Sequence, residues 1–538
     1  MLARPTFGPA EILPFAASRA PDKTALVVAN TRLSYRELDE RSNAVAAGLQ
    51  ERGIRAGDVC SVYSQNCWEW IVAYHGILKA GAVVNPVNVM LTGTELVYVL
   101  DDCKAKAVFA GGAQMEVVDS VADQLTGLKL IFSFGDGGPQ SVPFADLLAI
   151  GAGRQFDQQS ADPTALCSIG YTSGTTGHPK GAMQSHQSIL LNCALTAAMH
   201  GRTANDVTVT ALPAPHVYGN VAINSTFLSG GTVVLMERFD AAGALSLLES
   251  ERATMFEGVP AMYSMMVASE AFVATDLSSL EKCTIGGQTF TPDLIRRWNT
   301  RTPVPLLELW GMTEISGLGT THALYLPQVN GSIGVALPGM DLRIVSLDDG
   351  TEVHPDEHGE LTVRGPLVML GYHGRPDSTA EVLSSDGWLR TGDVAYRDRT
   401  GHVFIVDRLK DMIITGGYNV YPAEIERVVG SHPDVAMVAV GGLPDEVKGE
   451  IAVAYVVAVE HVDLDPDAVL AYCKGRLAAY KRPREVIVVQ SLPTTSSGKL
   501  MRRKLSEIHP GAAIPPLSCR DKEGPNNYPH DGSADHIE

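Results

Sequence analysis

The segment Tyr171-Thr-Ser-Gly-Thr-Thr-Gly-His-Pro-Lys-Gly181 contains three glycines, four serine or threonine side chains and one lysine. It follows the apolar segment Ala165-Leu-Cys-Ser-Ile169, which we expect to be a strand. Glycines let a backbone turn tightly and approach a ligand, so that successive N–H groups converge on one anion. Hydroxyl groups donate to phosphate oxygens, and a lysine adds a positive charge. The segment is therefore typical of a phosphate-binding loop, with candidate ligands Thr172, Ser173, Gly174, Thr175, Thr176, Gly177 and Lys180.

Two other interpretations of this loop are a Walker A motif and a flexible surface linker. The Walker A spacing Gly-x-x-x-x-Gly-Lys-Ser/Thr is not found in it. Stretches rich in glycine, serine and threonine often are linkers. The embedded Lys180 and the strand-like segment before the loop favour phosphate binding over the linker.

The composition bounds the class of protein. The chain has 538 residues, more than one hydrophobic core usually supports, so we expect two or more domains. Its 45% apolar and 19% charged residues are ordinary for a soluble globular protein. The formal net charge of −19 argues against nucleic acid as a partner, because nucleic-acid binding normally leaves a basic footprint. Any phosphate-bearing ligand must then be held by locally concentrated donors.

Targeting signals are not found in the sequence. The eight cysteines are scattered without a C-x-x-C pair, which is typical of reduced thiols in a cytosolic protein. The N-terminus shows no signal-peptide pattern, and no run reaches the ~18 apolar residues that a membrane span requires. The C-terminal residues His536-Ile-Glu538 are not a peroxisomal address. We therefore expect a cytoplasmic protein without an integral membrane segment.

The first half of the chain alternates helix-like and strand-like segments. The capping-box sequences Ser34-Tyr-Arg-Glu37 and Thr92-Gly-Thr-Glu95 predict the starts of two helices, the first extending to about Arg52. Strand character is found in four segments, Val59–Ser64, Ala82–Val87, Val207–Leu212 and Thr232–Met236. Strands that alternate with helices predict parallel α/β sheets.

Beyond about residue 330 the pattern changes. The short strand-like runs Asp341–Val345, Glu360–Arg364 and His402–Val406 predict an antiparallel, barrel-like section. The charged run Asp407-Arg-Leu-Lys-Asp411 then interrupts the apolar pattern. After it come a helix from Pro422, strands Val435–Val440 and Ile451–Val459, a helix Pro466–Ala479 and a strand Glu485–Val489, enough for a separate α+β domain.

The expected architecture is therefore α/β. We predict a large N-terminal domain over residues 1–407 that includes the barrel-like section, and a hinge at 408–410. A mobile α+β C-terminal domain follows over 411–508, and a mobile tail rich in Pro, Gly, Asn and Asp over 509–538.

Further segments carry groups suited to nucleotide chemistry. Trp310-Gly-Met-Thr-Glu314 follows the expected buried strand Pro305-Leu-Leu-Glu-Leu309 and offers an aromatic face, a hydroxyl and a carboxylate at one strand end, where parallel sheets bind ligands. Arg390-Thr-Gly-Asp393 places a carboxylate after a glycine turn, suited to two ribose hydroxyls. Thr494-Thr-Ser-Ser-Gly-Lys499 holds a lysine on a Ser/Gly loop. Each has an ordinary alternative: core packing, a turn cap and a solvated surface lysine.

Together these segments resemble the adenylate-forming superfamily of acyl- and aryl-CoA ligases, luciferases and peptide-synthetase adenylation domains. The resemblance extends from about Thr31 to Leu505. It rests on motifs in the same order and at similar distances, namely Tyr171–Gly181, Trp310–Glu314, Arg390–Asp393, Asp407–Glu426 and Ser497–Lys499. One departure is Trp310, where that superfamily usually has tyrosine, so a stacking face is kept and a hydroxyl is lost.

The resemblance implies a ligase that works in two steps. A carboxylate is a poor acyl donor because its leaving group is too basic. Reaction with Mg²⁺ and ATP gives an acyl-AMP and pyrophosphate, and coenzyme A then gives the thioester and AMP. ATP, Mg²⁺ and coenzyme A are the implied cofactors, and a homodimer is one possible assembly.

The resemblance also implies residue roles. Thr172–Lys180 hold the β- and γ-phosphates, Thr313 the α-phosphate, and Glu314 the Mg²⁺ ion. Asp393 and Arg408 fix the ribose. Lys499 bridges the carboxylate and the α-phosphate, where charge builds up during displacement. Adenine and carboxylate are lined by the remaining implied residues, Gly287 and Gln288 of Gly286-Gly-Gln288, Trp310 and Gly311.

Lys499 and the loop Gly416-Gly417-Tyr-Asn419 both belong to the C-terminal domain and cannot face one active site together. The resemblance implies that this domain rotates between the half-reactions about Lys410, with Gly416, Gly417 and Asn419 as cofactor-binding candidates. His216, in Leu212-Pro-Ala-Pro-His-Val-Tyr-Gly219, matches a position that guards the carboxylate or thiol passage. A purely structural histidine is the alternative.

The acid is predicted to be apolar. Between Pro213 and Met236 there is no Asp or Glu to pair with a substrate ammonium group. Val217, Tyr218, Val221, Ala222 and Ile223 indicate an apolar pocket, and Gly317 and Gly319 indicate room for an elongated substrate. We therefore favour a medium- or long-chain fatty acid, with an aryl or cinnamate-type acid as the alternative.

Three other functions stay open. An adenylating enzyme of this kind can load a carrier protein, although no carrier sequence follows Leu505. A luciferase-type oxidoreductase would need the same adenylation. A catalytically dead nucleotide-binding module is disfavoured by the presence of Lys499, Glu314 and Asp393.

Overall fold

The computed structural model describes residues 8–135, 137–138, 140–156, 162–172, 178–287, 292–302, 304–445, 447–494 and 500–509. The candidate residues Ser173, Gly174, Thr175, Thr176, Gly177, Gln288 and Lys499 lie outside this set, as does the predicted tail except His509.

A nine-stranded sheet carries half of the expected site. Its order is β16 (Val335–Ala336), β15 (Gly317–Thr321), β14 (Leu306–Met312), β13 (Lys282–Gly286), β12 (Met255–Gly258), β10 (Val207–Thr210), β11 (Thr232–Leu235), β1 (Thr24–Val28) and β2 (Thr31–Ser34). The strands from β14 to β1 pair in parallel. They are buried on both faces, as parallel sheets between helices are.

An eight-stranded sheet carries the other half. Its order is β19 (Gly371–Tyr372), β9 (Lys180–Ser185), β8 (Leu166–Thr172), β4 (Val83–Pro86), β3 (Val59–Tyr63), β5 (Ala107–Gly111), β6 (Leu130–Phe134) and β7 (Val142–Pro143). The β8–β9 pair is an antiparallel hairpin and β19 extends it, whereas β8 through β7 pair in parallel.

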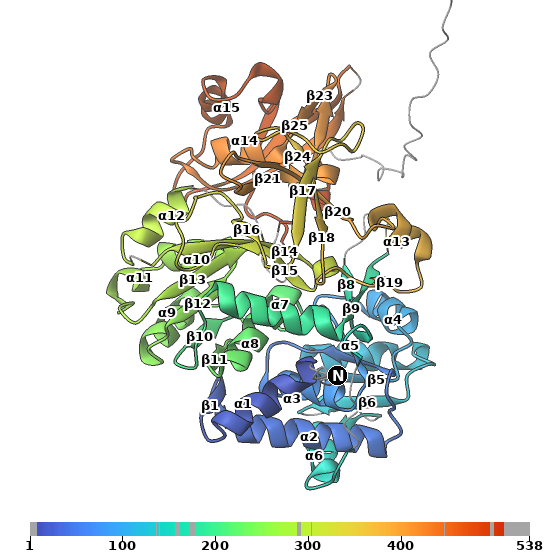
Figure 1. Cartoon of the computed structure of the whole chain (residues 1–538). Coiled ribbons are helices and arrows are strands. Elements are labelled where there is room, and N and C mark those ends of the chain that lie inside the picture. Colours follow the sequence, from blue (N-terminus) through green and yellow to red (C-terminus); the bar gives the residue numbers. More distant parts are fainter. Residues whose placement is uncertain are drawn as a thin grey trace, which may run out of the picture.

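Helices cover and join the two sheets (Figure 1). They are α1 (Ile12–Arg19), α2 (Tyr35–Glu51), α3 (Trp68–Lys79), α4 (Gly93–Asp102), α5 (Ala113–Val121), α6 (Phe144–Gly151), α7 (His186–Met199), α8 (Val217–Ser229), α9 (Ala241–Ser250), α10 (Pro260–Ala268), α11 (Ala271–Ala274) and α12 (Pro292–Asn299). One buried apolar cluster combines residues of α2, α3, α8, β1, β3 and β11, so it connects both sheets.

A smaller antiparallel section follows, as predicted. Its sheet has the order β17 (Asp341–Val345), β18 (Gly359–Arg364), β20 (Leu389–Arg397) and β21 (Val403–Arg408). Helix α13 (Pro376–Val382) lies between β19 and β20 in the chain. The short helix η4 (Leu409–Asp411) then leads into the C-terminal part.

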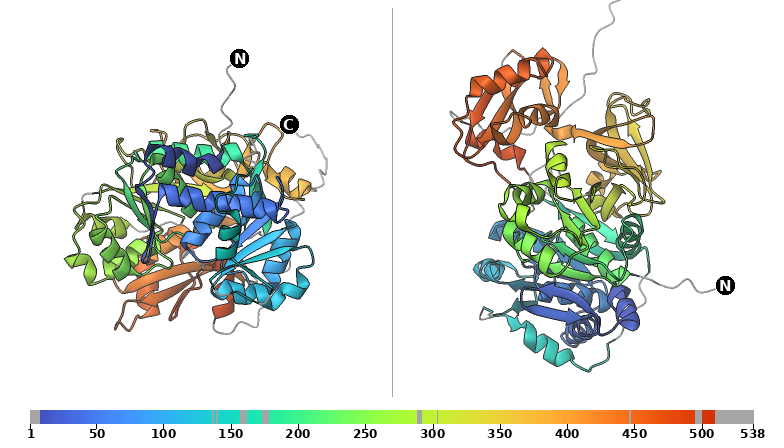
Figure 2. Two further views of the ribbon diagram at one scale, coloured as in Figure 1. Left: turned by 90° about the horizontal axis from the view of Figure 1, so that it is seen from below. Right: turned by 90° about the vertical axis from the view of Figure 1, so that its left-hand side faces the viewer.

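The C-terminal part has its own sheet and its own buried clusters. The sheet contains β22 (Ile413–Thr415), β23 (Tyr418–Val420), β24 (Val435–Asp445), β25 (Gly449–Ala458) and β26 (Glu485–Val488), with helices α14 (Pro422–Val429) and α15 (Pro466–Lys474). In Figure 2 it stands apart at one end of the molecule, beside the antiparallel section. An α/β fold with a large N-terminal and a smaller C-terminal domain is confirmed.

Local signals predicted several element ends correctly. Ser34 and Thr92 cap α2 and α4 through the expected capping boxes. The helix predicted over Pro466–Ala479 is shorter, because it stops at Gly475 and Arg482 donates to the Lys474 carbonyl at 2.9 Å. Among the described residues, no helix has the length and apolarity to cross a bilayer.

Candidate functional site

The two ends of the glycine-rich motif lie in the β8–β9 hairpin. Thr172 ends β8, Lys180 begins β9, and the two are register partners. The Thr172 hydroxyl donates to the Lys180 carbonyl at 3.4 Å. Residues 173–177 lie outside the described set. The structure therefore shows the base of the proposed phosphate loop.

The hairpin packs against the segment that carries Thr313 and Glu314. A Cβ atom on Gly170 would lie 2.7 Å from Cγ2 of Thr313, closer than real Cβ contacts come. On β9, Gln184 Nε2 donates to the Thr313 carbonyl at 2.9 Å. Glycine at position 170 therefore lets two motifs that are distant in sequence come into contact.

Glu314 lies in the short helix η3 (Thr313–Ile315), directly after β14, and its side chain is buried. The Tyr372 hydroxyl donates to Glu314 Oε1 at 2.9 Å. Desolvation by burial raises the pKa of Glu314, while the hydrogen bond from Tyr372 and the nearby Arg408 act in the opposite direction. A bound cation would relieve the desolvation penalty.

Lys180 contacts the same tyrosine. Its Nζ lies 5.4 Å from the centre of the Tyr372 ring, within cation–π range. The Lys180 ammonium group also pairs with Glu381, whose Oε2 is 4.0 Å away. Burial raises the pKa of Tyr372, so its hydroxyl stays protonated and donates at neutral pH. Tyr372 thus links the base of the phosphate loop to Glu314.

Three residues predicted to bind the nucleotide form one contact group. Asp393 and Arg408 are register partners on β20 and β21, and Arg408 Nε donates to Asp393 Oδ1 at 2.7 Å. Trp310 Nε1 donates to Asp393 Oδ2, also at 2.7 Å. The indole therefore supplies a hydrogen-bond donor at the position where the sequence indicated a lost hydroxyl. The Trp310 ring is 7% exposed, and its stacking on a base stays a prediction.

Two candidate glycines have structural reasons of their own. Gly287, directly after β13, has a φ of +92°, in the region that favours glycine. A Cβ on Gly311 would lie 2.1 Å from the Gly317 carbonyl oxygen, so Gly311 permits the irregular β14–β15 pairing. Their predicted contact with substrate or cofactor is compatible with these positions.

In the C-terminal part, Gly416 and Gly417 form the two-residue turn between β22 and β23. Their φ angles of +57° and +82° suit the turn that joins two antiparallel strands. Asn419 lines a groove with Tyr421 and residues 346–358. This hairpin lies well away from β8 and β14 (Figure 1). A role in cofactor binding requires another arrangement of the two domains, and it stays a prediction.

A cluster of charged groups, of which Asp407 is buried and the others are partly buried, lies at the joint between the two parts of the chain. Asp407, at the end of β21, accepts from the Ala423 N–H at 2.7 Å and lies 3.7 Å from Arg502 Nη1. Arg502 also pairs with Glu426 at 2.6 Å and with Asp411 at 3.2 Å. Burial raises the pKa of Asp407 to about 6, although the Arg502 charge opposes this. The cluster therefore ties the start of α14 and Arg502 to the segment predicted to be the hinge.

The predicted pivot, Lys410, is exposed in η4. Lys499 lies outside the described residues, and the flanking Thr494 and Leu500 pair in an isolated β-bridge. The structure thus describes the base of the loop that carries Lys499. The roles of Lys410 and Lys499 stay predictions.

His216 is the N-cap of α8. Its Nδ1 accepts a hydrogen bond from the Tyr218 backbone N–H at 3.2 Å, and its side chain is exposed. This is the structural role that the sequence left open. Control of a substrate passage is compatible with the exposure and stays a prediction.

One expectation about the acid pocket is wrong for the described structure. A Cβ on Gly317 would lie 2.6 Å from Val221 Cγ2 and 2.8 Å from Asn192 Oδ1, and one on Gly319 would lie 2.6 Å from the Trp310 ring. These glycines let β15 pack closely against α7, α8 and β14. They leave no room for an elongated substrate.

Sequence reasoning missed Tyr372, Gln184 and Arg502. Tyr372 and Gln184 have no local pattern that singles them out, because their partners in η3 are far away in the sequence. Arg502 lies in the basic run Leu500-Met-Arg-Arg-Lys-Leu505, directly after the Lys499 loop. Three consecutive basic residues give no local sign of which one is paired inside the structure.

The described residues include a candidate ligand for Mg²⁺. No group of three or more His, Cys, Asp or Glu side chains within them could hold a metal ion. Mg²⁺ at nucleotide sites takes one or two carboxylates together with substrate phosphates and waters. Glu314, a single buried carboxyl near the base of the phosphate loop, fits that pattern.

Comparison with protein families identifies the class. The description "AMP-binding enzyme" matches residues 13–373, and "AMP-binding enzyme C-terminal domain" matches residues 424–499. Fold and site together define an enzyme of this kind. The chain belongs to the AMP-binding enzyme family, and it is a ligase, as its relatives are.

Individual relatives narrow the class further. An indoleacetate–CoA ligase of Aromatoleum aromaticum is 37% identical over 500 residues, 91% of this chain and 96% of the relative. A long-chain-fatty-acid–CoA ligase of Bacillus subtilis is 33% identical over 92% of this chain and 93% of the relative. A crystal structure of the anthranilate CoA ligase AuaEII in complex with anthranoyl-AMP superposes with a TM-score of 0.88 at 26% identity, covering 94% of this chain and 97% of that chain.

Proposed function

We propose that this enzyme joins an apolar carboxylic acid to coenzyme A through an acyl-AMP intermediate, with ATP as the source of AMP. The observation that carries the proposal is the meeting of Lys180, Tyr372 and Glu314 with Asp393 and Arg408, where three sheets come together beside the carboxyl ends of β8 and β14. Open α/β sheets bind ligands at such ends. The relatives named above are CoA ligases, and one holds an acyl-AMP.

Binding of the nucleotide would be divided among these groups. Asp393 is aligned by Trp310 and Arg408, and a carboxylate has about four acceptor sites, so it can also accept two ribose hydroxyls. Lys180 and the loop at 173–177 would hold the β- and γ-phosphates. Thr313 would contact the α-phosphate.

Glu314 would ligate Mg²⁺, which neutralises charge on the departing pyrophosphate when bound. Lys499 would stabilise the charge that builds up between the acid carboxylate and the α-phosphate. After pyrophosphate leaves, rotation of the C-terminal domain about Lys410 would withdraw Lys499. The Gly416–Asn419 hairpin would then approach the thiol, and His216 would stand at its passage.

Two classes of acid are supported by different observations. The apolar composition of α8 and the Bacillus subtilis relative favour a fatty acid. The indoleacetate and anthranilate ligases favour an aryl acid. In both classes the substrate has no ammonium group, in agreement with the stretch from Pro213 to Met236 that contains no Asp or Glu.

The test is a pyrophosphate-release assay with hexanoate, palmitate, phenylacetate and cinnamate, each with and without coenzyme A. We expect slow release without coenzyme A, fast turnover with it, and a thioester detected by mass spectrometry. Asp393→Ala is the matched negative control. Folded protein that releases no pyrophosphate with any of these acids would contradict the function, and equal rates with and without coenzyme A would favour a carrier protein.

A further inference from the structure

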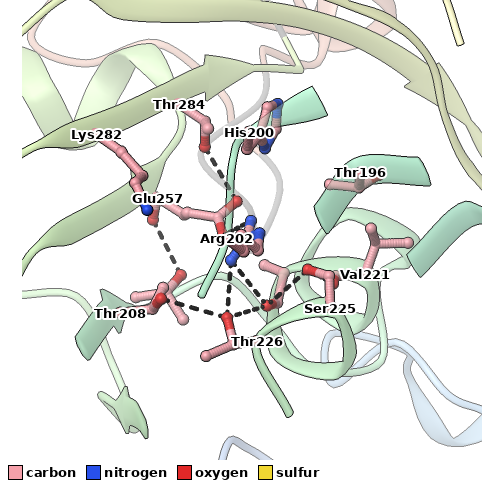
Figure 3. Close-up of polar contacts among 12 residues, drawn as sticks. Thr196, His200, Arg202, Thr208, Val221, Ser225, Thr226, Glu257, Lys282 and Thr284 are labelled. Carbon is pink, nitrogen blue, oxygen red and sulfur yellow. Dashed lines mark hydrogen bonds and ion pairs between the residues drawn. The ribbon is translucent and has the colours of Figure 1, made fainter. Parts of the chain in front are cut away.

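A network of buried charged and hydroxyl side chains lies beside α8, and the proposed reaction does not use it (Figure 3). Its centre is an ion pair between Arg202 and Glu257, whose side chains are 0% and 1% exposed. Burying two charges is costly unless both are paired and hydrogen-bonded. Apolar side chains of similar volume often stabilise a core as well as a buried ion pair does, so the pair indicates a role other than stability.

Hydroxyl groups extend the pair along one side of the helix. Arg202 Nη1 donates to Thr226 Oγ1 at 2.7 Å. Glu257 Oε2 accepts from Thr284 Oγ1 at 3.0 Å, and Thr284 Oγ1 lies 2.7 Å from the Tyr218 hydroxyl. A continuous chain of polar contacts thus runs from Tyr218 in the first turn of α8 to Thr226 in its third turn.

The network lies close to Gly287, where the proposed function puts the acid carboxylate. Glu257 and Thr284 are register partners on β12 and β13, and β13 ends two residues later at Gly286. Tyr218 and Thr226, two turns apart, face this side of α8 together. An acid whose carboxylate lies at Gly287 and whose body extends along α8 would meet Tyr218 first and the Arg202–Glu257 pair beneath it.

Resting on the proposed function, we propose that the Arg202–Glu257 network is the floor of the acid pocket and limits the substrate to compact acids, such as arylacetic acids and short fatty acids. A longer apolar tail would have to separate the pair, which leaves both charges buried without their partners and is strongly unfavourable. The network thus selects against long-chain fatty acids by their length.

The first measurement is a chain-length series with the wild-type protein. We expect kcat/KM for hexanoate and phenylacetate to exceed that for palmitate by about a hundredfold or more, since each methylene that cannot be accommodated changes binding by about tenfold or more. Palmitate used as well as hexanoate would overturn the proposal and leave the proposed function intact. Inactivity with every acid would overturn both.

The second measurement removes the charges of the floor, so that a longer tail can displace flexible apolar side chains without separating an ion pair. In Arg202→Met/Glu257→Leu both charges are replaced by apolar groups of similar size, so no charge is left unpaired. We expect the palmitate-to-hexanoate ratio of kcat/KM to rise at least about tenfold, mainly through a lower KM for palmitate. An unchanged ratio in a variant with a normal thermal transition would overturn the proposal.

A matched control uses the other buried pair of this region. Lys282 and Asp206 lie 2.8 Å apart at the amino end of β13, away from Gly287, and both are nearly buried. Lys282→Met/Asp206→Asn should lower stability without changing the ratio. The same shift in this control would mean that general loosening, and not the floor, sets the length limit.

A structural measurement covers the case in which the double variant does not fold. The wild-type protein is crystallised with a non-hydrolysable decanoyl-adenylate analogue. We expect the tail to end or turn aside above Tyr218 and Thr284, with the Arg202–Glu257 pair intact. A tail that lies alongside an undisturbed pair, in a straight channel past Thr226, would refute the floor.

Discussion

Asp407 and Arg408 are neighbours at the end of β21, yet they contact different halves of the molecule. Asp407 accepts from Ala423 and pairs with Arg502 in the C-terminal part. Arg408 pairs with Asp393 in the N-terminal part, in contact with Trp310 through that carboxylate. Consecutive residues of a strand point to opposite faces, so one strand end can serve two partners.

The difference teaches how the two tasks of the enzyme are connected. The proposed ribose-binding group and the domain joint contain adjacent residues, so we expect a movement of β21 to affect both. Their electrostatics nevertheless differ. Asp393 is held by a cation and an indole N–H, whereas Asp407 shares the guanidinium of Arg502 with Glu426 and Asp411.

The largest effect is expected from removal of the proposed catalytic lysine of the C-terminal part. Lys499→Ala should lower the rate of acyl-AMP formation by about a hundredfold to a thousandfold, since one stabilising charge at a reaction centre has this value. Conversion of supplied acyl-AMP to thioester should be almost unchanged. Separate assays of the two half-reactions check this, and an equal loss in both would remove Lys499 from its proposed role.

The second prediction concerns the charge cluster at the domain joint. Arg502→Met leaves Asp407 and Glu426 without their shared cation, and we expect the free energy of unfolding to fall by about 3 kcal/mol. ATP affinity should change little, because Arg408 and Asp393 keep their contact. Denaturant titration and nucleotide binding measure the two quantities, with the exposed Arg476→Met as control. A parallel loss of ATP affinity would show that joint and nucleotide site are one unit.

A third change weakens the nucleotide side alone. Trp310→Phe keeps the ring but removes the donor to the buried Asp393, and a hydrogen bond to a charged group has a value that corresponds to about tenfold in affinity. The KM for ATP should rise accordingly, with the stability of the joint unchanged. Trp388→Phe, at a tryptophan packed between Arg343 and Arg364, is the control. An unchanged KM for ATP would show that the indole N–H does not align Asp393.

The last change concerns a carboxyl group on β14, the strand that also carries Trp310. Burial raises the pKa of Glu308 to about 8 from the ordinary 4.5, and the Gly331 N–H that donates to it at 2.7 Å only partly opposes this. Between these pH values the folded protein keeps a proton that the unfolded chain has lost, so the free energy of unfolding falls as the pH rises from about 4.5 to about 8.

Glu308→Gln removes this titration and keeps an acceptor for Gly331. The variant should match the wild type near pH 5 and have the higher Tm near pH 8. Calorimetry at both pH values tests it, with the exposed Glu116→Gln as control. Identical pH slopes for Glu308→Gln and the wild type would contradict the assignment of this dependence to Glu308.

Local features of the fold could be predicted from the sequence. The capping boxes at Ser34 and Thr92 act within one helical turn, so four residues of sequence contain the whole interaction. The shorter α15 shows the limit of this reasoning, because its end is fixed by Gly475 and by the side chain of Arg482. The order of strands within the two sheets followed from no local pattern.

The residues of the candidate site could be predicted where they belong to a short sequence motif. Lys180, Glu314, Asp393 and Arg408 are brought into one region, as the resemblance implied. The contacts between motifs were not predictable. Tyr372 reaches Glu314 only because β19 pairs with β9, and Arg202 meets Glu257 across 55 positions of sequence because β10 and β12 are neighbours in the sheet.

The close approach at Gly170 has a consequence for how this enzyme can change. The main chain at Gly170 in the β8–β9 hairpin packs against the methyl group of Thr313, and this contact sets the distance between the hairpin and η3. The distance therefore does not depend on side chains of α8. Substitutions along α8 and its polar partners can therefore alter which acid enters while the activating groups keep their places. New substrates can arise in this scaffold by exchange of a few buried residues, without a new catalytic centre.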